Sequence, residues 1–146
     1  MVGKPSGMAR RGTVTVEFAL VAPVLMLLLA AVLNGALVLR TAVCAANAAR
    51  AGAQYGSRSA VASLDTAGMQ AAALNSLPGL TLMTATATRN CKCPDGTAVS
   101  CGGSCVGGKM LIYVQVNTQA SAYTVFDYSG LSLSKLVASQ AVMRVQ

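Results

Sequence analysis

The stretch FALVAPVLMLLLAAVLNGALVL, residues 18–39, decides the fold of this chain because its 22 residues carry no charge. At a rise of about 1.5 Å per residue, a helix of this length is about 33 Å long and crosses a hydrocarbon core of about 30 Å. Pro23 and the Asn34-Gly35 pair are compatible with this interpretation, since membrane helices accept both proline and glycine. The sequence therefore predicts one membrane-spanning helix near its start.

Two other interpretations of this segment have less support. A cleaved secretory signal has an apolar core of about 7–15 residues, which is shorter than this one. Small-residue sites such as Ala46-Asn47-Ala48 lie downstream, so signal cleavage is kept as the weaker alternative. A lipoprotein site would need a small residue just before Cys44, and Val43 occupies that position. The segment is therefore expected to stay in the chain as an anchor.

The composition argues against catalysis and against nucleic-acid binding. The 146 residues suffice for one small domain plus an anchor, and they contain no histidine, which excludes Ser-His and Cys-His catalysis. The four acids, Glu17, Asp65, Asp95 and Asp127, show no spacing that suggests a catalytic pair. Although the net charge is +7, the basic residues are scattered rather than clustered. No enzyme, cofactor, metal, small-molecule substrate or nucleic acid is expected.

The residues after the apolar segment predict a continued helix and a small α+β head. Residues 41–58, TAVCAANAARAGAQYGSR, are rich in alanine, which favours helix, whereas Gly52 and Gly56 weaken it near its end. The many small side chains suit close packing against other helices, or they merely fill an exposed stalk. The expected organisation is a leader at 1–12, a transmembrane helix with its extension at 13–57, and an extracytoplasmic head at 58–146.

Within the head, one short helix and about three antiparallel strands are expected. The helix covers residues 64–77 with Asp65 as its N-cap. The strands cover residues 80–89, 110–118 and 136–145, the last with helix as an alternative. Alternation places Thr84, Thr86 and Thr88 on one face of the first strand, and Met110, Ile112, Val114 and Val116 on one side of the second. Residues 123–130, YTVFDYSG, are expected to form a connecting loop or short strand.

A glycine-rich loop between the first two strands contains Cys91, Cys93, Cys101 and Cys105. The pattern C-x-C…C-x₃-C differs from the C-x₂-C of a zinc knuckle, so two disulfides are favoured over zinc and over free thiols. Four cysteines permit three pairings, and crossed or nested pairs between the two halves are expected. Disulfides require an oxidising compartment, which puts the head outside the cytoplasm. Cys44 is expected to be a small buried residue, with an intermolecular bridge as the alternative.

Lysine and arginine fix the orientation only weakly. Lys4, Arg10 and Arg11 precede the apolar segment, while Arg40, Arg50 and Arg58 follow it within about 20 residues, the range over which such charges act. The adjacent Arg10-Arg11 pair slightly favours a cytoplasmic N-terminus. The cysteines, rather than the basic residues, decide the orientation.

Glu17 is an unusual residue at the start of a membrane segment. It is one residue too far from Thr13 for a capping box, and the two positions are i and i+4 on one helix face. An unpaired carboxylate entering lipid costs several kcal/mol, and no Lys or Arg occupies residues 12–39. Arg11 is one possible partner. A free α-amino group at Thr13, created by a cut after Gly12, is a better one.

The order of Gly12, four residues, Glu17 and Phe18, followed by a long apolar run, reproduces the prepilin cleavage pattern. The first 40 or so residues resemble the TadE-like family of tight-adherence (Flp, type IVc) pilus assembly proteins, and the tail LVASQAVMRVQ resembles the family's end more weakly. The resemblance implies cleavage by a prepilin peptidase after Gly12, a mature N-terminus at Thr13, and Glu17 as a subunit-pairing residue. Ala31 and Gly35 form a small-xxx-small pair that would pack against another helix.

The expected function is therefore that of a minor pilin or pseudopilin in the bacterial inner membrane. Its expected partners are the prepilin peptidase and other pilin or pseudopilin subunits. The alternative is a single-pass binding module with a disulfide-stapled extracytoplasmic head that is not processed at Gly12.

Overall fold

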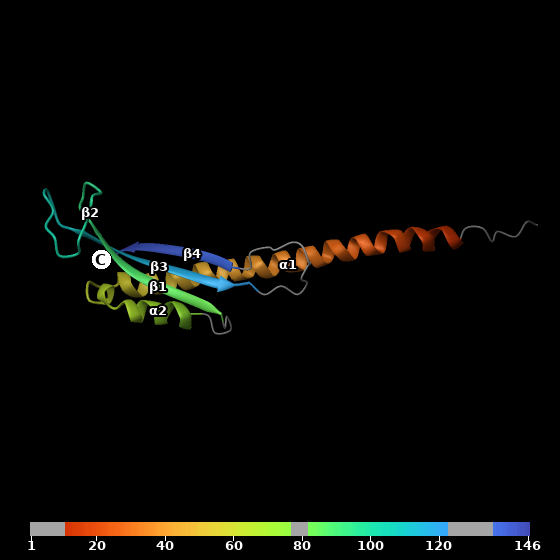
Figure 1. Ribbon diagram of the computed structural model, residues 1–146, viewed down its shortest axis with the longest axis horizontal. Coiled ribbons are helices and arrows are strands. Elements are labelled where there is room, and N and C mark those ends of the chain that lie inside the picture. Colours follow the sequence, from red (N-terminus) through yellow and green to blue (C-terminus); the bar gives the residue numbers. More distant parts are fainter. Residues whose placement is uncertain (1–10, 77–81, 123–135) are drawn as a thin grey trace, which may run out of the picture. The chain divides into compact units, whose positions relative to one another are not determined.

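The protein is represented by a computed structural model that describes residues 11–76, 82–122 and 136–146 (Figure 1). The leader up to residue 10 and the segment 123–130 lie outside the described residues. The chain divides into two compact units, Met1–Ala36 and Leu37–Gln146. The elements in chain order are α1 (Arg11–Ser57), a 3-10 helix η1 (Ala62–Leu64), α2 (Thr66–Asn75), β1 (Met83–Lys92), β2 (Ala98–Val99), β3 (Leu111–Ser121) and β4 (Leu136–Arg144).

The described part of the first unit is the N-terminal part of α1, and its side chains are apolar on every side. Phe18, Leu20 and Met26 are each about 70% exposed, and the other large apolar side chains before Ala36 are also exposed. A helix that is hydrophobic all round is stable in lipid and not in water. Among the described residues, α1 is the one helix long and apolar enough to cross a membrane. The length and composition of α1 therefore support the predicted membrane anchor.

The second unit is built on an antiparallel sheet with the strand order β2-β1-β3-β4. β1 pairs with β3 without interruption from Met83–Ala120 to Lys92–Leu111, and β3 pairs with β4 from Tyr113–Arg144 to Ser121–Leu136. Alternate residues therefore face opposite sides. The inner face carries Val114, Val116 and Thr118, all fully buried, and the outer face is mostly exposed.

Helices α1 and α2 cover the inner face of the sheet (Figure 1). The part of α1 that belongs to the second unit buries a stripe of small residues: Thr41, Ala45, Ala48, Ala49, Gly52, Ala53 and Gly56. Small side chains let the helix backbone approach its neighbours closely. Of the two alternatives for the alanine-rich extension, close packing and an exposed stalk, the structure shows close packing. The extension packs against the sheet and α2.

Hydrogen bonds connect α1 to the sheet and to the start of α2. The buried hydroxyl of Thr118 on β3 donates a hydrogen bond to the carbonyl oxygen of Ala45 on α1, at 2.8 Å. At the start of α2, one carboxylate oxygen of Asp65 accepts from the Gly68 N–H at 2.8 Å, and the other accepts from the Tyr55 hydroxyl at 2.9 Å. Asp65 is thus the N-cap of α2, as predicted, and it also connects α2 to α1.

The fold class predicted from the sequence is confirmed: an α+β chain with a long apolar helix, a short helix and an antiparallel sheet. All three expected strands are present, and the segment for which helix was an alternative is the strand β4. The sheet has a fourth strand that was not expected, the two-residue β2, which pairs with Cys91 and Lys92. This short strand lies within the cysteine loop, where its two residues gave no recognisable pattern.

Candidate functional site

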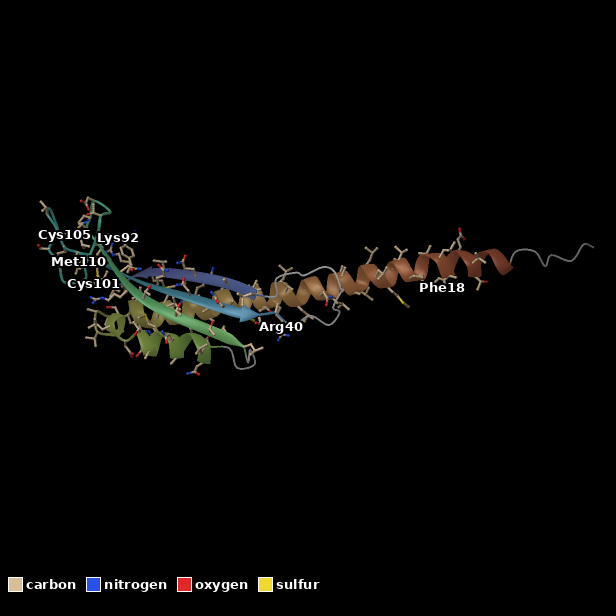
Figure 2. The ribbon with its side chains drawn as sticks, viewed as in Figure 1. Phe18, Arg40, Lys92, Cys101, Cys105 and Met110 are labelled. Atoms are coloured by element: carbon tan, nitrogen blue, oxygen red, sulfur yellow. A yellow bond between two sulfur atoms is a disulfide. The ribbon has the colours of Figure 1, made fainter. Side chains whose placement is uncertain are left out.

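The residues of the predicted cleavage and pairing site lie in the first turns of α1. The backbone of Gly12 and Thr13 is helical, and the helix runs on through Glu17 and Phe18 without interruption. The side chains of Glu17 and Phe18 are exposed, and Figure 2 labels Phe18 on this segment. An exposed carboxylate at the start of an apolar helix is available to a cation of another molecule. The structure does not test whether the chain is cut after Gly12.

Ala31 and Gly35 lie one helical turn apart in the same exposed segment. A Cβ added at Gly35 would meet no atom within 4 Å among those considered. The position is therefore open to the close approach of another helix. The packing of this pair against another helix stays a prediction.

Gly52 and Gly56 differ sharply from Gly35. A Cβ at Gly52 would lie 2.7 Å from the Met69 carbonyl oxygen and 3.1 Å from the Val116 Cγ1. A Cβ at Gly56 would collide with the Met69 side chain. The sequence suggested only that these two glycines weaken the helix. In the structure they are positions at which α1 packs closely against α2 and the sheet, and the spacing of small residues was the signal that could have revealed this.

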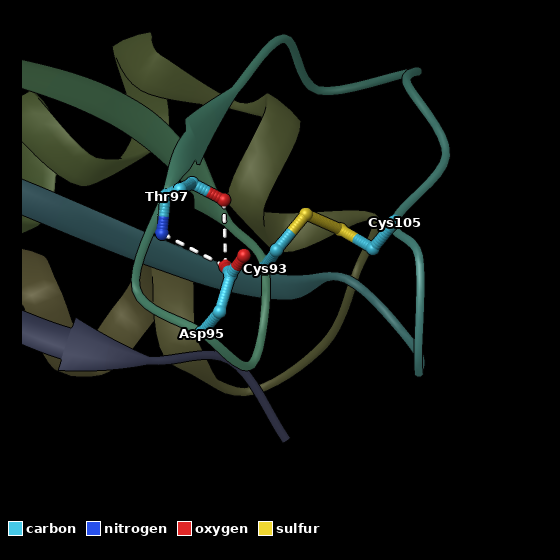
Figure 3. The surroundings of a disulfide bond; sticks show 4 residues. All are labelled: Cys93, Asp95, Thr97 and Cys105. Carbon is cyan, nitrogen blue, oxygen red and sulfur yellow. Dashed lines mark hydrogen bonds between the residues drawn. A yellow bond between two sulfur atoms is a disulfide. The ribbon is translucent and has the colours of Figure 1, made fainter.

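All four cysteines of the loop form disulfides, Cys91–Cys101 and Cys93–Cys105, and Figure 3 shows the second of these bonds. The two bonds are interleaved along the chain, which is the crossed pairing among the crossed and nested ones that were expected. Cys91 and Cys93 are 3% and 5% exposed, so the bonds attach the loop to the buried end of β1. With every sulfur of the loop bonded to another sulfur, the zinc alternative is overturned. Cys44 is the free cysteine of the described residues and is half-buried.

A compact turn holds Cys93 in place. The Asp95 carboxylate accepts hydrogen bonds from the N–H of Thr97 at 3.0 Å and from its hydroxyl at 2.6 Å (Figure 3). These bonds stabilise the charged carboxylate and lower the pKa of Asp95. Gly96 has a φ of +90°, a conformation that a residue with a Cβ rarely adopts. The turn therefore depends on both the acid and the glycine.

We expect the Cys93→Ala/Cys105→Ala double variant to lower the free energy of unfolding of the second unit by about 2–3 kcal/mol. The reason is the loop-closure entropy restored to the unfolded chain when a bond spanning a sequence separation of 12 is lost. Chemical unfolding of the full chain in detergent measures the change. Cys44→Ala is the matched control, since Cys44 closes no loop. An equal loss in the two variants would contradict a structural role for the disulfide.

A protein-family comparison bears directly on this helix. The model of the family described as "TadE-like protein" matches residues 12–54. Residues 12–54 are TadE-like. This TadE-like segment begins at Gly12, contains Glu17, Phe18, Ala31 and Gly35, and ends within the buried small-residue stripe. No curated protein and no solved structure matches the chain.

The TadE-like segment confirms the resemblance carried by the N-terminal residues. Together with the apolar helix it fits a membrane protein associated with the Tad pilus, in a family that is generally not enzymatic. The resemblance of the tail is not part of the match, which ends at residue 54. In the structure the tail consists of β4 and the two residues after it.

Proposed function

We propose that the chain is a minor pilin or pseudopilin of a Tad pilus, cut by a prepilin peptidase between Gly12 and Thr13. The observation that carries the proposal is the TadE-like segment itself, which starts at Gly12 and leads through Glu17 into an exposed apolar helix. Residues 18–39 hold the protein in the inner membrane. The N-terminal side faces the cytoplasm, and the disulfide-bonded unit faces the oxidising exterior.

Cleavage changes the charged groups at the start of the membrane helix. It removes Arg11 and leaves a positively charged α-amino group on Thr13. In an assembly of parallel helices, this group pairs with the Glu17 carboxylate of a neighbouring subunit. Both charges then enter a low-dielectric environment as a pair, which avoids the cost of an isolated carboxylate in lipid. The pairing makes assembly depend on cleavage.

The mature N-terminus tests this proposal. In a host that supplies the peptidase, mass spectrometry should find a chain that starts at Thr13. We expect Gly12→Ala to abolish this species because the peptidase recognises the glycine before the cut. Gly7→Ala, which changes another glycine of the leader, is the matched control and should be cleaved normally.

An alternative function remains testable in the same experiment. A single-pass binding module with a disulfide-stapled head would keep its leader, and Gly12→Ala would change nothing. A wild-type chain that begins at Met1 or Met8 would overturn processing at Gly12.

A further inference from the structure

β4 forms one margin of the sheet, and one row of its backbone groups points away from β3. The N–H of Val145 donates to the carbonyl oxygen of Ile112 at 2.8 Å, which sets the alternation of this antiparallel ladder. By that alternation, the N–H and C=O of Leu136, Ala138, Gln140, Val142 and Arg144 point outward. In the part of the chain that the structure describes, no strand pairs with them.

Within the described residues, β4 carries little of the usual protection against strand pairing. Natural sheets block their margins with proline, bulges, short strands or charges. β4 has nine residues, contains neither proline nor glycine, and pairs with β3 in an unbroken register. Its one charged residue is Arg144, at the end of the strand. Leu136 and Val142 are more than half exposed.

The opposite margin of the sheet is also available over most of its length. β2 pairs only with Cys91 and Lys92, so within residues 11–76, 82–122 and 136–146 no strand pairs with the outward groups of Met83, Ala85 and Ala87. α2 contacts this strand from the inner face, where Met69 and Ala73 join Ala87 in the core. Among the described residues, no strand occupies the place beside Met83, Ala85 and Ala87 in the plane of the sheet.

The direction of α1 relative to the strands determines which edge strands of two copies can pair. Going along α1, Ala45 contacts Thr118, Gly52 lies near Val116, and Gly56 lies near Val114. α1 therefore runs antiparallel to β3 and in the same direction as β1 and β4. In copies whose second units lie side by side in a parallel arrangement, these parts of α1 point the same way. Two β4 strands paired antiparallel would point these helices in opposite directions, whereas parallel pairing of β4 with β1 would not.

The register of the strands is also compatible with parallel pairing of β4 with β1 of a second copy. Thr86, Asn117 and Gln140 lie at one level across the sheet. If a second copy lies beside the first without displacement along the strands, Gln140 faces Thr86 of that copy, and both side chains are on the outer face. In a parallel ladder the outward groups of Gln140 would then bond to those of Ala85 and Ala87, which are also outward. From residue 136 to 142, no charged side chain would face another.

We propose that this chain associates with a second copy of itself by parallel pairing of β4 with β1, which extends the sheet from one subunit to the next. Such an interface is heterologous, so it leaves a free margin at each end and can continue to further copies. The proposal rests on the membrane anchoring in the proposed function, and not on cleavage after Gly12.

Site-directed cross-linking in a host without other Tad components tests the proposal. Two differently tagged full-length copies, both in a Cys44→Ser background, carry Gln140→Cys and Thr86→Cys respectively. A short bismaleimide should join them, because adjacent strands lie about 4.8 Å apart. The control pair combines Gln140→Cys with Gln54→Cys, which is exposed on α1. We expect the first pair to yield more than about tenfold as much product, through the high effective concentration of neighbouring strands.

Several results would overturn the proposal: equal yields in the two pairs, a dominant product between two Gln140→Cys copies, or cross-linking only to a different protein. Adding Ala138→Pro to the Gln140→Cys copy removes an outward N–H that β3 does not use, so the yield should fall. An unchanged yield would also overturn the proposal. Mass mapping of the Cys91–Cys101 and Cys93–Cys105 bonds verifies that this variant folds. A chain that is not cut after Gly12 leaves all of these readouts intact.

Discussion

Replacing Glu17 by Gln should leave cleavage after Gly12 intact and reduce association of the mature chain with other pilin subunits about a hundredfold or more. The amide cannot pair with a charged α-amino group, so that group would remain unpaired in the membrane. Removing one partner of a buried ion pair costs about 3–5 kcal/mol, which is the basis of this magnitude. The carboxylate is exposed in the described chain, so its loss should not disturb the fold of the single subunit.

The measurement has two parts. Mass spectrometry determines the N-terminus, and quantitative co-isolation from membrane and fibre fractions determines association. Glu17→Asp retains the charge and should restore part of the association. Val16→Ala, at the exposed neighbouring position, is the control for a general effect of mutation in this turn. Full association of the Glu17→Gln chain would remove the proposed role of the carboxylate.

The second large effect is expected in the core of the second unit. Gly52→Ala places a Cβ 2.7 Å from the Met69 carbonyl oxygen and 3.1 Å from both the Ala73 Cβ and the Val116 Cγ1. Backbone atoms must shift, and such overpacking costs about 1–3 kcal/mol. The gain of up to about 1 kcal/mol in helix propensity from glycine to alanine only partly offsets this cost. We therefore expect a lower thermal midpoint for the full chain in detergent.

Gly35→Ala is the matched control for this prediction because it makes the same chemical change in the same helix. A Cβ there meets no atom within 4 Å among those considered, so the second unit should keep its stability. Equal thermal midpoints for the two variants would contradict the close packing at Gly52.

Strands and disulfides were predictable because their patterns have few interpretations. β1 alternates threonine with small residues, and β3 alternates valine with polar residues, so each has one clear inner face. The cysteine spacing disfavoured a zinc site, but the sequence alone could not decide among the permitted disulfide pairings. That choice needed the positions of Cys91 and Cys93 at the end of β1.

The role of the alanine-rich half of α1 was not decided by the sequence. Ala and Gly give little contrast between a buried and an exposed helix face, so hydrophobic periodicity is weak there. Thr118 illustrates the same difficulty, because its buried hydroxyl is satisfied by Ala45, a residue 73 positions earlier in the chain. The candidate site at Gly12 and Glu17, in contrast, was predictable from the sequence. It was found from the motif alone, and the structure adds that its residues lie on a continuous helix and that Glu17 is exposed.

Val145 and Gln146 join the end of β4 to β3 and to α1. The N–H of Val145 donates to Ile112, and the N–H of Gln146 donates to the carbonyl oxygen of Ser57 at the end of α1. During synthesis, the small-residue stripe of α1 stays uncovered until α2 and β3 have been made, because Met69, Val116 and Thr118 are among its contacts. A fragment starting after Ser57 would lack that stripe, so Met69, Val114 and Val116 would lose the helix that packs against them.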